Sequence, residues 1–309
     1  MITQPTLRSD LLKGQVAIVT GGSRGIGGAT SEILAANGAH VVIADIDEVA
    51  AATTANSINN RFNNLSGSAS VFIGDLVAEG ICDQLVTDTL LEYGRLDIVV
   101  NNAGYAWDSS IHAMTDKQFQ AMLDIHLIVP FRLARACAPV FRQAAETENA
   151  QGISNHRKFV LVSSLAGKWG LAGGSNYASA KAGMLGLMTS LTQEWGNLRV
   201  NCNSVCFGVI QTRLAQPQSE REVIHTGGNE IKVGMPHKQA ERLGINIDID
   251  HIPSDKELYT PWPNPRASLG RNGTIQEAAD SIFWLCSPLA NYVTGQSIVV
   301  SGGDRGGMS

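Results

Sequence analysis

The chain has no long apolar run, no cluster of basic residues and no repeated or low-complexity segment. Its 309 residues carry 23 lysines and arginines against 28 aspartates and glutamates, a net charge of −5 that is spread along the chain. The lack of a basic patch argues against nucleic acid as a partner, and no stretch approaches the ~18 apolar residues of a membrane span. The polar N-terminal segment lacks the apolar centre of a secretory signal. We expect a cytoplasmic protein that binds neither nucleic acid nor membranes.

Cysteine and histidine are sparse, with five and seven residues. The cysteines are odd in number, scattered and mostly inside apolar segments, which indicates reduced core thiols and not a disulfide framework. Cys202 and Cys206 are close in the sequence, but no second Cys or His pair could complete a metal site with them. Their even spacing on a strand puts both on one face. Apart from His126, the histidines show no ligand spacing. We therefore expect no bound metal.

The pattern of the chain predicts one α/β domain over residues 1–309. Hydrophobic residues make up 44% of it, and no Pro/Ser-rich linker divides it. Short β-branched runs alternate with helical stretches, which is typical of a doubly wound parallel sheet of the Rossmann type, with ligands at the carboxyl ends of the strands. The predicted strands are 15–20, 40–44, 70–74, 96–100, 158–163, 199–205 and 297–300. Thr274 and Glu277 form a capping box that opens a helix to Cys286.

A glycine-rich turn follows the first predicted strand. Residues 20–27 read TGGSRGIG and lead into a helical stretch that stops at Gly38. Gly21, Gly25 and Gly27 allow a tight turn, and the N-terminus of the next helix offers N–H groups and a positive dipole to a pyrophosphate. The spacing differs from the generic Gly-x-Gly-x-x-Gly fingerprint, so the case for a nucleotide site rests on the strand before it and the helix after it.

Asp45 ends the second predicted strand, eighteen residues after Gly27. A carboxylate there can accept both ribose hydroxyls of an adenosine and repels a 2′-phosphate, which favours NAD over NADP. Arg24 in the glycine loop argues the other way, because a guanidinium could neutralise that phosphate. A solvated turn residue is the plainer interpretation of Asp45. We expect NAD.

Tyr177 and Lys181 are four residues apart, so they share one face of a helix. A free tyrosine titrates near ~10. A unit charge about 4 Å away at an effective dielectric near 20 contributes about 4 kcal/mol, enough to bring the phenol within reach of neutral pH. Ser164 precedes this helix and could hold a substrate oxygen against the phenol. Alone, Tyr-x-x-x-Lys is a common pair that aids solubility.

Together these motifs resemble the short-chain dehydrogenase/reductase family. The glycine loop, the run Asn101–Gly104 after a strand, Ser164, Tyr177-x-x-x-Lys181 and residues 292–296 (YVTGQ) occur in order and at family spacing. The resemblance implies a nicotinamide oxidoreductase that interconverts a secondary alcohol and a ketone, in which Tyr177 is the general acid/base. It also implies that Ser164 polarises the reacting oxygen, and that Lys181 lowers the pKa of the tyrosine and holds the nicotinamide ribose.

The resemblance carries further positions to the cofactor. Asp75 and Leu76 are expected to flank the adenine, Asn102 to lie beside the cofactor, and Ile210 to contact the carboxamide. The full set of expected cofactor-binding residues is Gly21, Ser23, Arg24, Gly25, Ile26, Gly27, Asp45, Asp75, Leu76, Asn102, Gly104, Tyr177, Lys181, Ile210 and Thr212.

Two residues depart from the family pattern. His126 stands where most members have asparagine; it either relays protons as the fourth catalytic residue or is bonded to a backbone carbonyl with no part in turnover. The same histidine is familiar in the (3R)-hydroxyacyl-CoA dehydrogenase branch, which favours a 3-hydroxyacyl or 3-oxoacyl thioester or another hydrophobic hydroxy compound as substrate. Phe207 replaces a proline. The alternatives are a nucleotide-binding sensor or scaffold that has lost turnover, and an epimerase or dehydratase of the extended branch, which the glycine spacing disfavours.

Two segments are longer than a typical loop. Residues 146–156 form a polar connection, and residues 209–269 lie where the family carries its substrate lid. Trp262 and Trp169 are candidates for lining a hydrophobic substrate pocket, while a plain surface extension explains the second segment equally well. The family commonly forms homodimers or homotetramers. The small, apolar face of Ala182, Leu185, Gly186 and Thr189 suits a helix contact between subunits, and burial within one subunit explains it equally well.

Overall fold

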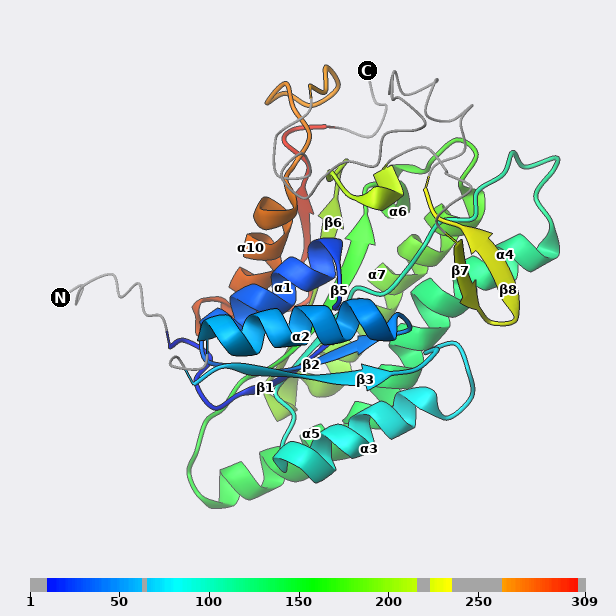
Figure 1. Cartoon of the computed structure of the whole chain (residues 1–309). Helices are drawn as coiled ribbons and strands as arrows, with labels where there is room; N and C mark the ends of the chain where they lie inside the picture. The colour runs from blue at the N-terminus through cyan, green and yellow to red at the C-terminus, as the bar shows by residue number, and fades with distance from the viewer. Residues whose placement is uncertain (1–9, 63–65, 216–222, 235–262, 305–309) are drawn as a thin grey trace.

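A computed structural model describes residues 10–62, 66–215, 223–234 and 263–304. Within these residues, one parallel sheet has the strand order β3-β2-β1-β4-β5-β6-β9 (Figure 1). Its strands are β1 (Val16–Thr20), β2 (His40–Asp45), β3 (Ser68–Ile73), β4 (Ile98–Asn101), β5 (Arg157–Ser164), β6 (Val200–Phe207) and β9 (Ser297–Val300).

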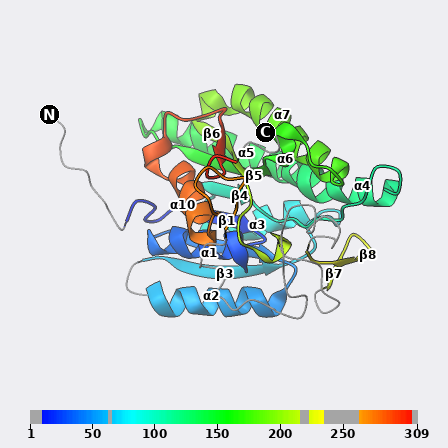
Figure 2. The same ribbon diagram turned by 90° about the horizontal axis from the view of Figure 1, so that it is seen from above.

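Helices cover both faces of the sheet, as the view from above shows (Figure 2). On one face α1, α2 and α10 enclose an apolar cluster with β1, β2 and β6, and on the other α3, α5 and α7 enclose a second cluster. The helices are α1 (Gly25–Ala36), α2 (Glu48–Phe62), α3 (Ile81–Tyr93), α4 (Asp116–Leu123), α5 (Val129–Ala150), α6 (Ala166–Trp169), α7 (Ser175–Trp195) and α10 (Ile275–Cys286). The predicted α/β fold with a doubly wound parallel sheet is confirmed.

The order of the strands reverses at β1, which pairs with β2 on one side and β4 on the other. The loops that leave β1 and β4 therefore run to opposite faces and open a crevice at the carboxyl edge of the sheet. The glycine turn follows β1 and the run Asn101–Gly104 follows β4, so both motifs border this crevice. The topology alone brings them together across about eighty residues of sequence.

The helical segment between β4 and β5 is divided into three parts. α4 starts with a capping box between Thr115 and Gln118, a π-helical turn follows over Asp124–Ile128, and α5 continues to Ala150. A π-helical turn is rare and occurs most often at functional sites. Because α5 extends to Ala150, the polar connection before β5 is shorter than the expected 146–156. The second capping box, at Thr274, is confirmed.

A two-stranded antiparallel hairpin, β7 (Val223–Thr226) with β8 (Asn229–Lys232), lies apart from the main sheet, beside the carboxyl end of β3 and α4 (Figure 1). It belongs to the segment expected as a lid, yet its short, mostly polar strands gave no apolar run by which to predict it.

All five cysteines are buried and none is joined in a disulfide. Among the described residues, no helix is long and apolar enough to cross a membrane, and no group of His, Cys, Asp and Glu side chains is arranged to hold a metal ion.

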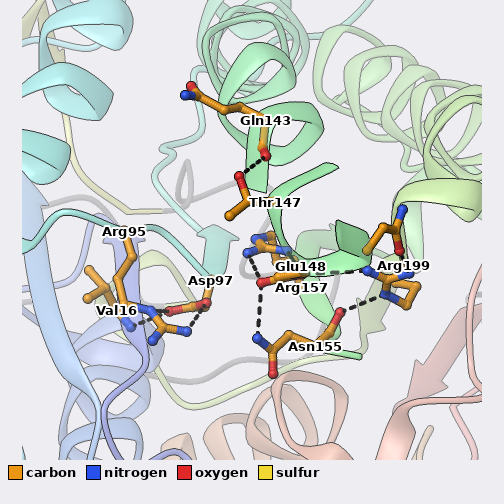
Figure 3. A network of polar contacts seen from close by, with 10 residues as sticks. Val16, Arg95, Asp97, Gln143, Thr147, Glu148, Asn155, Arg157 and Arg199 are labelled. Atoms are coloured by element: carbon orange, nitrogen blue, oxygen red, sulfur yellow. Dashed lines mark hydrogen bonds and ion pairs between the residues drawn. The ribbon is translucent and has the colours of Figure 1, made fainter. Parts of the chain in front are cut away.

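A buried ion pair holds the connection between α5 and β5 (Figure 3). Arg157 Nη2 lies 2.6 Å from Glu148 Oε1, and the two side chains are 4% and 11% exposed. Asn155 donates to the same carboxylate at 3.0 Å, and Arg199 lies 3.6 Å from it. Burial raises the pKa of Glu148, but the hydrogen bonds and charges of these partners outweigh it and hold the pKa below the ordinary value. The network fixes the amino-terminal edge of the sheet, opposite the crevice.

Glu148→Gln is expected to destabilise the protein by about 3 kcal/mol, because it leaves the buried Arg157 without its counter-charge. The matched control is Glu32→Gln, which removes the exposed pair with Arg61 and should change the unfolding free energy by less than about 1 kcal/mol. Urea denaturation measures both.

Since the pKa of Glu148 is lowered in the folded state, its contribution is complete above the unfolded pKa of a glutamate and is lost as pH falls through the lowered one. The difference in stability between wild type and Glu148→Gln should therefore shrink on acidification. Equal losses in the two variants at neutral pH would contradict this account.

Candidate active site

The turn from β1 into the start of α1, residues 21–27, forms a glycine cradle. Gly21 and Gly25 have left-handed φ angles of +60° and +54°. A Cβ on Gly21 would lie 2.9 Å from the Cα of Ala103, and a Cβ on Gly27 would overlap the carbonyl oxygen of Gly21. Side chains are thus excluded, and a ligand can approach the main chain closely.

The N-terminus of α1 is open to an anion. Arg24 occupies the N-cap position, its side chain makes no capping hydrogen bond, and the first turn contains no acidic residue. The first N–H groups and the positive end of the helix dipole therefore remain available. The cradle and this helix end together fit the pyrophosphate of a dinucleotide.

Thr20 and Asn102 fasten the two sides of the crevice to each other. Asn102 Nδ2 donates to the carbonyl oxygens of Thr20 and Gly21 at 3.0 and 3.1 Å. The Thr20 hydroxyl accepts from the backbone N–H groups of Asn102 and Ala103, both at 3.0 Å. Asn102 therefore shapes the glycine turn from its place at the end of β4.

Asp45 stands at the carboxyl end of β2, beside the glycine turn. Its Oδ2 accepts from the backbone N–H and the hydroxyl of Ser23 at 3.1 and 2.5 Å. Its Oδ1 accepts from the N–H groups of Ile46 and Asp47 at 2.8 and 3.1 Å. Arg24 is drawn away into an ion pair with Asp47 at 2.7 Å. The Asp45 carboxylate is thus rigidly held, while the Arg24 guanidinium is paired with Asp47.

Asp75 lies at the carboxyl end of β3, where its carboxylate meets the β7–β8 hairpin. Oδ1 accepts from the Thr226 hydroxyl at 2.8 Å and Oδ2 from the Gly227 N–H at 2.7 Å. Leu76, the next residue, is buried. The sequence motif predicted an adenine contact for this pair but not the hairpin.

Ser164, Tyr177 and Lys181 meet at the carboxyl end of β5. Ser164 is the last residue of β5, where a loop residue was expected, and its side chain is hydrogen-bonded to Tyr177. Lys181 Nζ donates to the carbonyl oxygen of Val162 at 2.6 Å and lies 5.6 Å from the centroid of the Tyr177 ring. The predicted helix face therefore brings the three groups into one site.

Burial governs the ionisation of this site. It raises the pKa of Tyr177 to about 12, although the hydrogen bond with Ser164 lowers it, and it lowers the pKa of Lys181 to about 7. The expectation that Lys181 brings the phenol toward neutral pH is wrong for this structure. The Coulomb argument from the sequence omitted desolvation, which disfavours the charged form of both groups.

His126 packs edge-on against Tyr177 from the π-helical turn, with ring centroids 5.0 Å apart. Its Nε2 lies 2.7 Å from the carbonyl oxygen of Tyr105. Since a carbonyl only accepts, Nε2 carries the proton and Nδ1 is an acceptor, which has no partner among the described residues. Burial and the charge of Lys181 hold the pKa of His126 well below its ordinary value, so the ring is neutral.

Asn176, which the sequence analysis missed, positions Tyr177. It is fully buried, and its Nδ2 donates to the carbonyl oxygens of Trp107 and Gln118 at 3.0 and 3.2 Å. Its Oδ1 accepts from the Tyr177 N–H at 2.8 Å. The start of α7 is thereby tied to α4 and to the loop after β4. The only signal in the sequence was an amide beside the candidate tyrosine.

Comparison with known proteins identifies the family. A family model described as "short chain dehydrogenase" matches residues 15–223, and one described as "Enoyl-(Acyl carrier protein) reductase" matches residues 248–304. The chain belongs to the short-chain dehydrogenase/reductase family. It is an enzyme of that family, an oxidoreductase whose members use nicotinamide cofactors.

Individual relatives cover almost the whole chain. The 3-oxoacyl-[acyl-carrier-protein] reductase of Chlamydia muridarum is 31% identical over 297 residues, 96% of this chain and 99% of that protein. The enzyme of the same name from Salmonella typhimurium is 28% identical over 94% of this chain and 97% of its own length. A solved structure of the citronellol catabolism dehydrogenase of Pseudomonas aeruginosa is 26% identical, with a TM-score of 0.68 over 97% of this chain and 98% of that one.

The remaining candidate residues of this short-chain dehydrogenase occupy different places. Ile210 is buried in the apolar cluster that contains α1 and α10, and it bridges to Gly273. The Thr212 methyl group would lie 3.9 Å from a Cβ on Gly25, so Thr212 borders the glycine turn. The side chain of Ile26 packs on an apolar cluster, which leaves only its main chain to the cradle. Trp169 ends α6 half-buried, and Trp262 lies outside the described residues.

Gly104→Ala is expected to destabilise the enzyme by about 1–3 kcal/mol, because the added Cβ would overlap Cε1 of His126. The control is the exposed Gly196 at the end of α7, where a Cβ meets nothing within 4 Å and φ is not left-handed; Gly196→Ala should change the unfolding free energy by less than about 0.5 kcal/mol. Urea denaturation measures both. A Gly104 variant as stable as its control would show that His126 is not fixed where the structure has it.

Proposed function

We propose that the protein is an NAD(H)-dependent oxidoreductase that interconverts a secondary alcohol and a ketone, with Tyr177 as general acid/base. The observation that carries the proposal is the meeting of Ser164, Tyr177 and Lys181 at the carboxyl edge of the sheet that also carries the glycine cradle. When bound, the nicotinamide cofactor supplies or accepts the hydride and in its oxidised form carries a positive ring charge.

Ser164 is suited to orient the reacting oxygen. Its Oγ accepts from the Ala166 N–H at 3.2 Å, which fixes the side chain at the end of β5. The hydroxyl proton, which in this structure is directed at Tyr177, would then be donated to a substrate oxygen that lies between the two groups. Ser164 and Tyr177 would both hydrogen-bond to the same substrate oxygen, and this would align the oxygen for proton transfer.

Tyr177 moves the proton. Burial keeps the phenol protonated, as is required for it to donate to the oxygen of a ketone during reduction. In the oxidation direction the phenolate must form first, and the positive charges of Lys181 and of the oxidised nicotinamide would both favour it. Lys181 would in addition hold the nicotinamide ribose.

The buried, neutral His126 is best suited to a positioning role. Its Nε2 proton is committed to the Tyr105 carbonyl, so it cannot also be donated along a relay. The ring fixes the loop after β4 against the face of Tyr177. This supports the structural alternative for His126 over its role as the fourth catalytic residue.

The substrate is proposed to be a 3-oxoacyl or 3-hydroxyacyl thioester or a similar hydrophobic hydroxy compound. The proposal follows from similarity to the 3-oxoacyl-[acyl-carrier-protein] reductases, and the citronellol catabolism dehydrogenase agrees with a hydrophobic alcohol. Residues 209–269 are proposed to cover the substrate in a single domain. We further propose a cytoplasmic enzyme, which suits five buried thiols.

A homodimer or homotetramer is proposed from one face of α7. Ala182, Gly186 and Thr189 are exposed on it, so burial within the subunit does not account for their small size. A face of small residues lets a second helix approach closely.

Tyr177→Phe is expected to reduce turnover by ~10²–10⁴ while leaving the affinity for NADH nearly unchanged. Wild type is first assayed with NAD⁺ against secondary alcohols and with NADH against ketones, including an acetoacetyl thioester. The variant is then compared by turnover on the active substrate and by calorimetric titration of NADH. Wild-type turnover in the variant would refute the assignment of the proton to Tyr177. Wild type without turnover on the whole panel would favour the sensor or scaffold.

Asp45→Ala is expected to relax the preference for NAD over NADP by at least about tenfold in kcat/KM, because a carboxylate facing a 2′-phosphate is removed. Asp280→Ala removes the same charge from the exposed face of α10 and should leave the ratio unchanged. An unaltered ratio in Asp45→Ala, or an equal shift in both variants, would rule out the ribose role of Asp45.

A further inference from the structure

The β7–β8 hairpin is anchored to the loop after β3 by polar contacts. Its turn contains Gly227 and Gly228, with φ of +55° and +71°. The turn presents the Thr226 hydroxyl and the Gly227 N–H to the two oxygens of Asp75, at 2.8 and 2.7 Å. Hydrogen bonds to an ionised carboxylate are among the stronger ones in proteins. The tip of the hairpin is therefore held at one defined carboxylate.

The hairpin also has an apolar anchor. Ile231 on β8 is only 1% exposed and belongs to the same buried cluster as Leu76 and Tyr105. Ile224 on β7 packs against that cluster. Two independent kinds of contact therefore place the hairpin against the loops that follow β3 and β4.

This location is the adenosine end of the dinucleotide site. Asp45 of β2 pairs in register with Ile73 of β3, and the Gly74 N–H donates to the Asp45 carbonyl at 3.0 Å. In a doubly wound sheet the carboxylate at the end of the second strand meets the adenosine ribose. The adenine then lies beyond it, toward the end of β3, where Asp75 and the hairpin stand.

The segment after β6 reaches both ends of the crevice. Thr212 borders Gly25 of the cradle, while residues 223–232 lie at Asp75. A hollow of about 320 Å³ is bordered by Asp75 and the hairpin, and its lining is polar: Asp75, His225, Thr226, Gly228, Asn229 and Glu230. A segment expected to cover the substrate thus also extends the wall of the cofactor site.

We propose that the β7–β8 hairpin is an additional nucleotide-binding element that closes on the adenine of the dinucleotide, with Asp75 shared between the hairpin and the base. Asp75 accepts from the N–H of Val77, the hydroxyl of Thr226 and the N–H of Gly227. A carboxylate has about four lone-pair sites, so one remains for the exocyclic amine of an adenine. Binding of the base and docking of the hairpin stabilise each other through this group. The inference rests on the proposed dinucleotide cofactor.

The test compares two reduced cofactors on Thr226→Val, which removes the hydroxyl at nearly constant shape. NADH carries the adenosine half, and reduced nicotinamide mononucleotide lacks it. The dissociation constant of NADH should rise about tenfold, and that of the mononucleotide should not change. Thr87→Val, an exposed threonine on α3, is the matched control and should alter neither. Thermal melting verifies that both variants are folded.

A second readout uses the wild-type chain and needs no variant. Addition of ADP, the adenosine half alone, should slow amide hydrogen exchange across residues 223–232. Three results with Thr226→Val would overturn the inference: unchanged NADH affinity, equal weakening of the binding of both cofactors, or tighter NADH binding, which would mean that the hairpin obstructs the site. In the second experiment, hydrogen exchange that ADP does not change would also overturn it. If the wild type bound neither reduced cofactor, the proposed function would be refuted. The exchange measurement with ADP would still test whether the hairpin binds the adenosine half of a nucleotide.

Discussion

Desolvation of Tyr177, which is partly buried, and of Lys181, which is buried, is the constraint on which the rest of the site depends. In a low-dielectric environment both charged forms are disfavoured, so the phenol holds its proton and the ammonium releases one more readily. At neutral pH the phenol is therefore neutral, and Lys181, with a pKa of about 7, is only partly charged. Under the proposed function, a group with such a high pKa would serve as an acid/base because the positive charge of the oxidised nicotinamide ring would favour its ionisation.

The sheet makes this coupling possible because it places every participant at one edge. β1 leads into the glycine cradle, β2 ends in Asp45, Asp75 follows β3, and β5 ends in Ser164. Asn102 hydrogen-bonds the loop after β4 to the glycine turn, and Asn176 hydrogen-bonds the start of α7 to the loop after β4. The Glu148–Arg157 ion pair lies at the other edge and stabilises the scaffold without touching the chemistry (Figure 3). Stability and function are thus divided between the two ends of the strands.

The core of the fold could be predicted from the sequence because buried parallel strands are continuous β-branched runs. The strand Ser297–Val300 and the capping box at Thr274 were placed correctly, and the other strands of the sheet to within about two residues. The glycine turn and the shared face of Tyr177 and Lys181 were equally accessible, since both depend on local spacing.

Other features depend on tertiary contacts that carry no periodic signal. The π-helical turn at His126 accommodates a ring packed against a glycine of a distant loop, and the β7–β8 hairpin has strands of only four residues. The pKa of Tyr177 could not be predicted either, because the sequence gives the distance to a charge but not the loss of solvent. The hairpin partners of Asp75 could not be predicted because they lie 151 and 152 residues away in the sequence.

The most direct test of the central claim is an ultraviolet difference titration of the phenolate, recorded for wild type minus Tyr177→Phe with and without saturating NAD⁺. The subtraction isolates one of the five tyrosines in the chain. The account predicts that without NAD⁺ the Tyr177 phenolate forms only near pH 12, and that NAD⁺ moves its formation toward neutral pH by at least about two pH units. Phenolate formation at the same pH with and without NAD⁺ would contradict it.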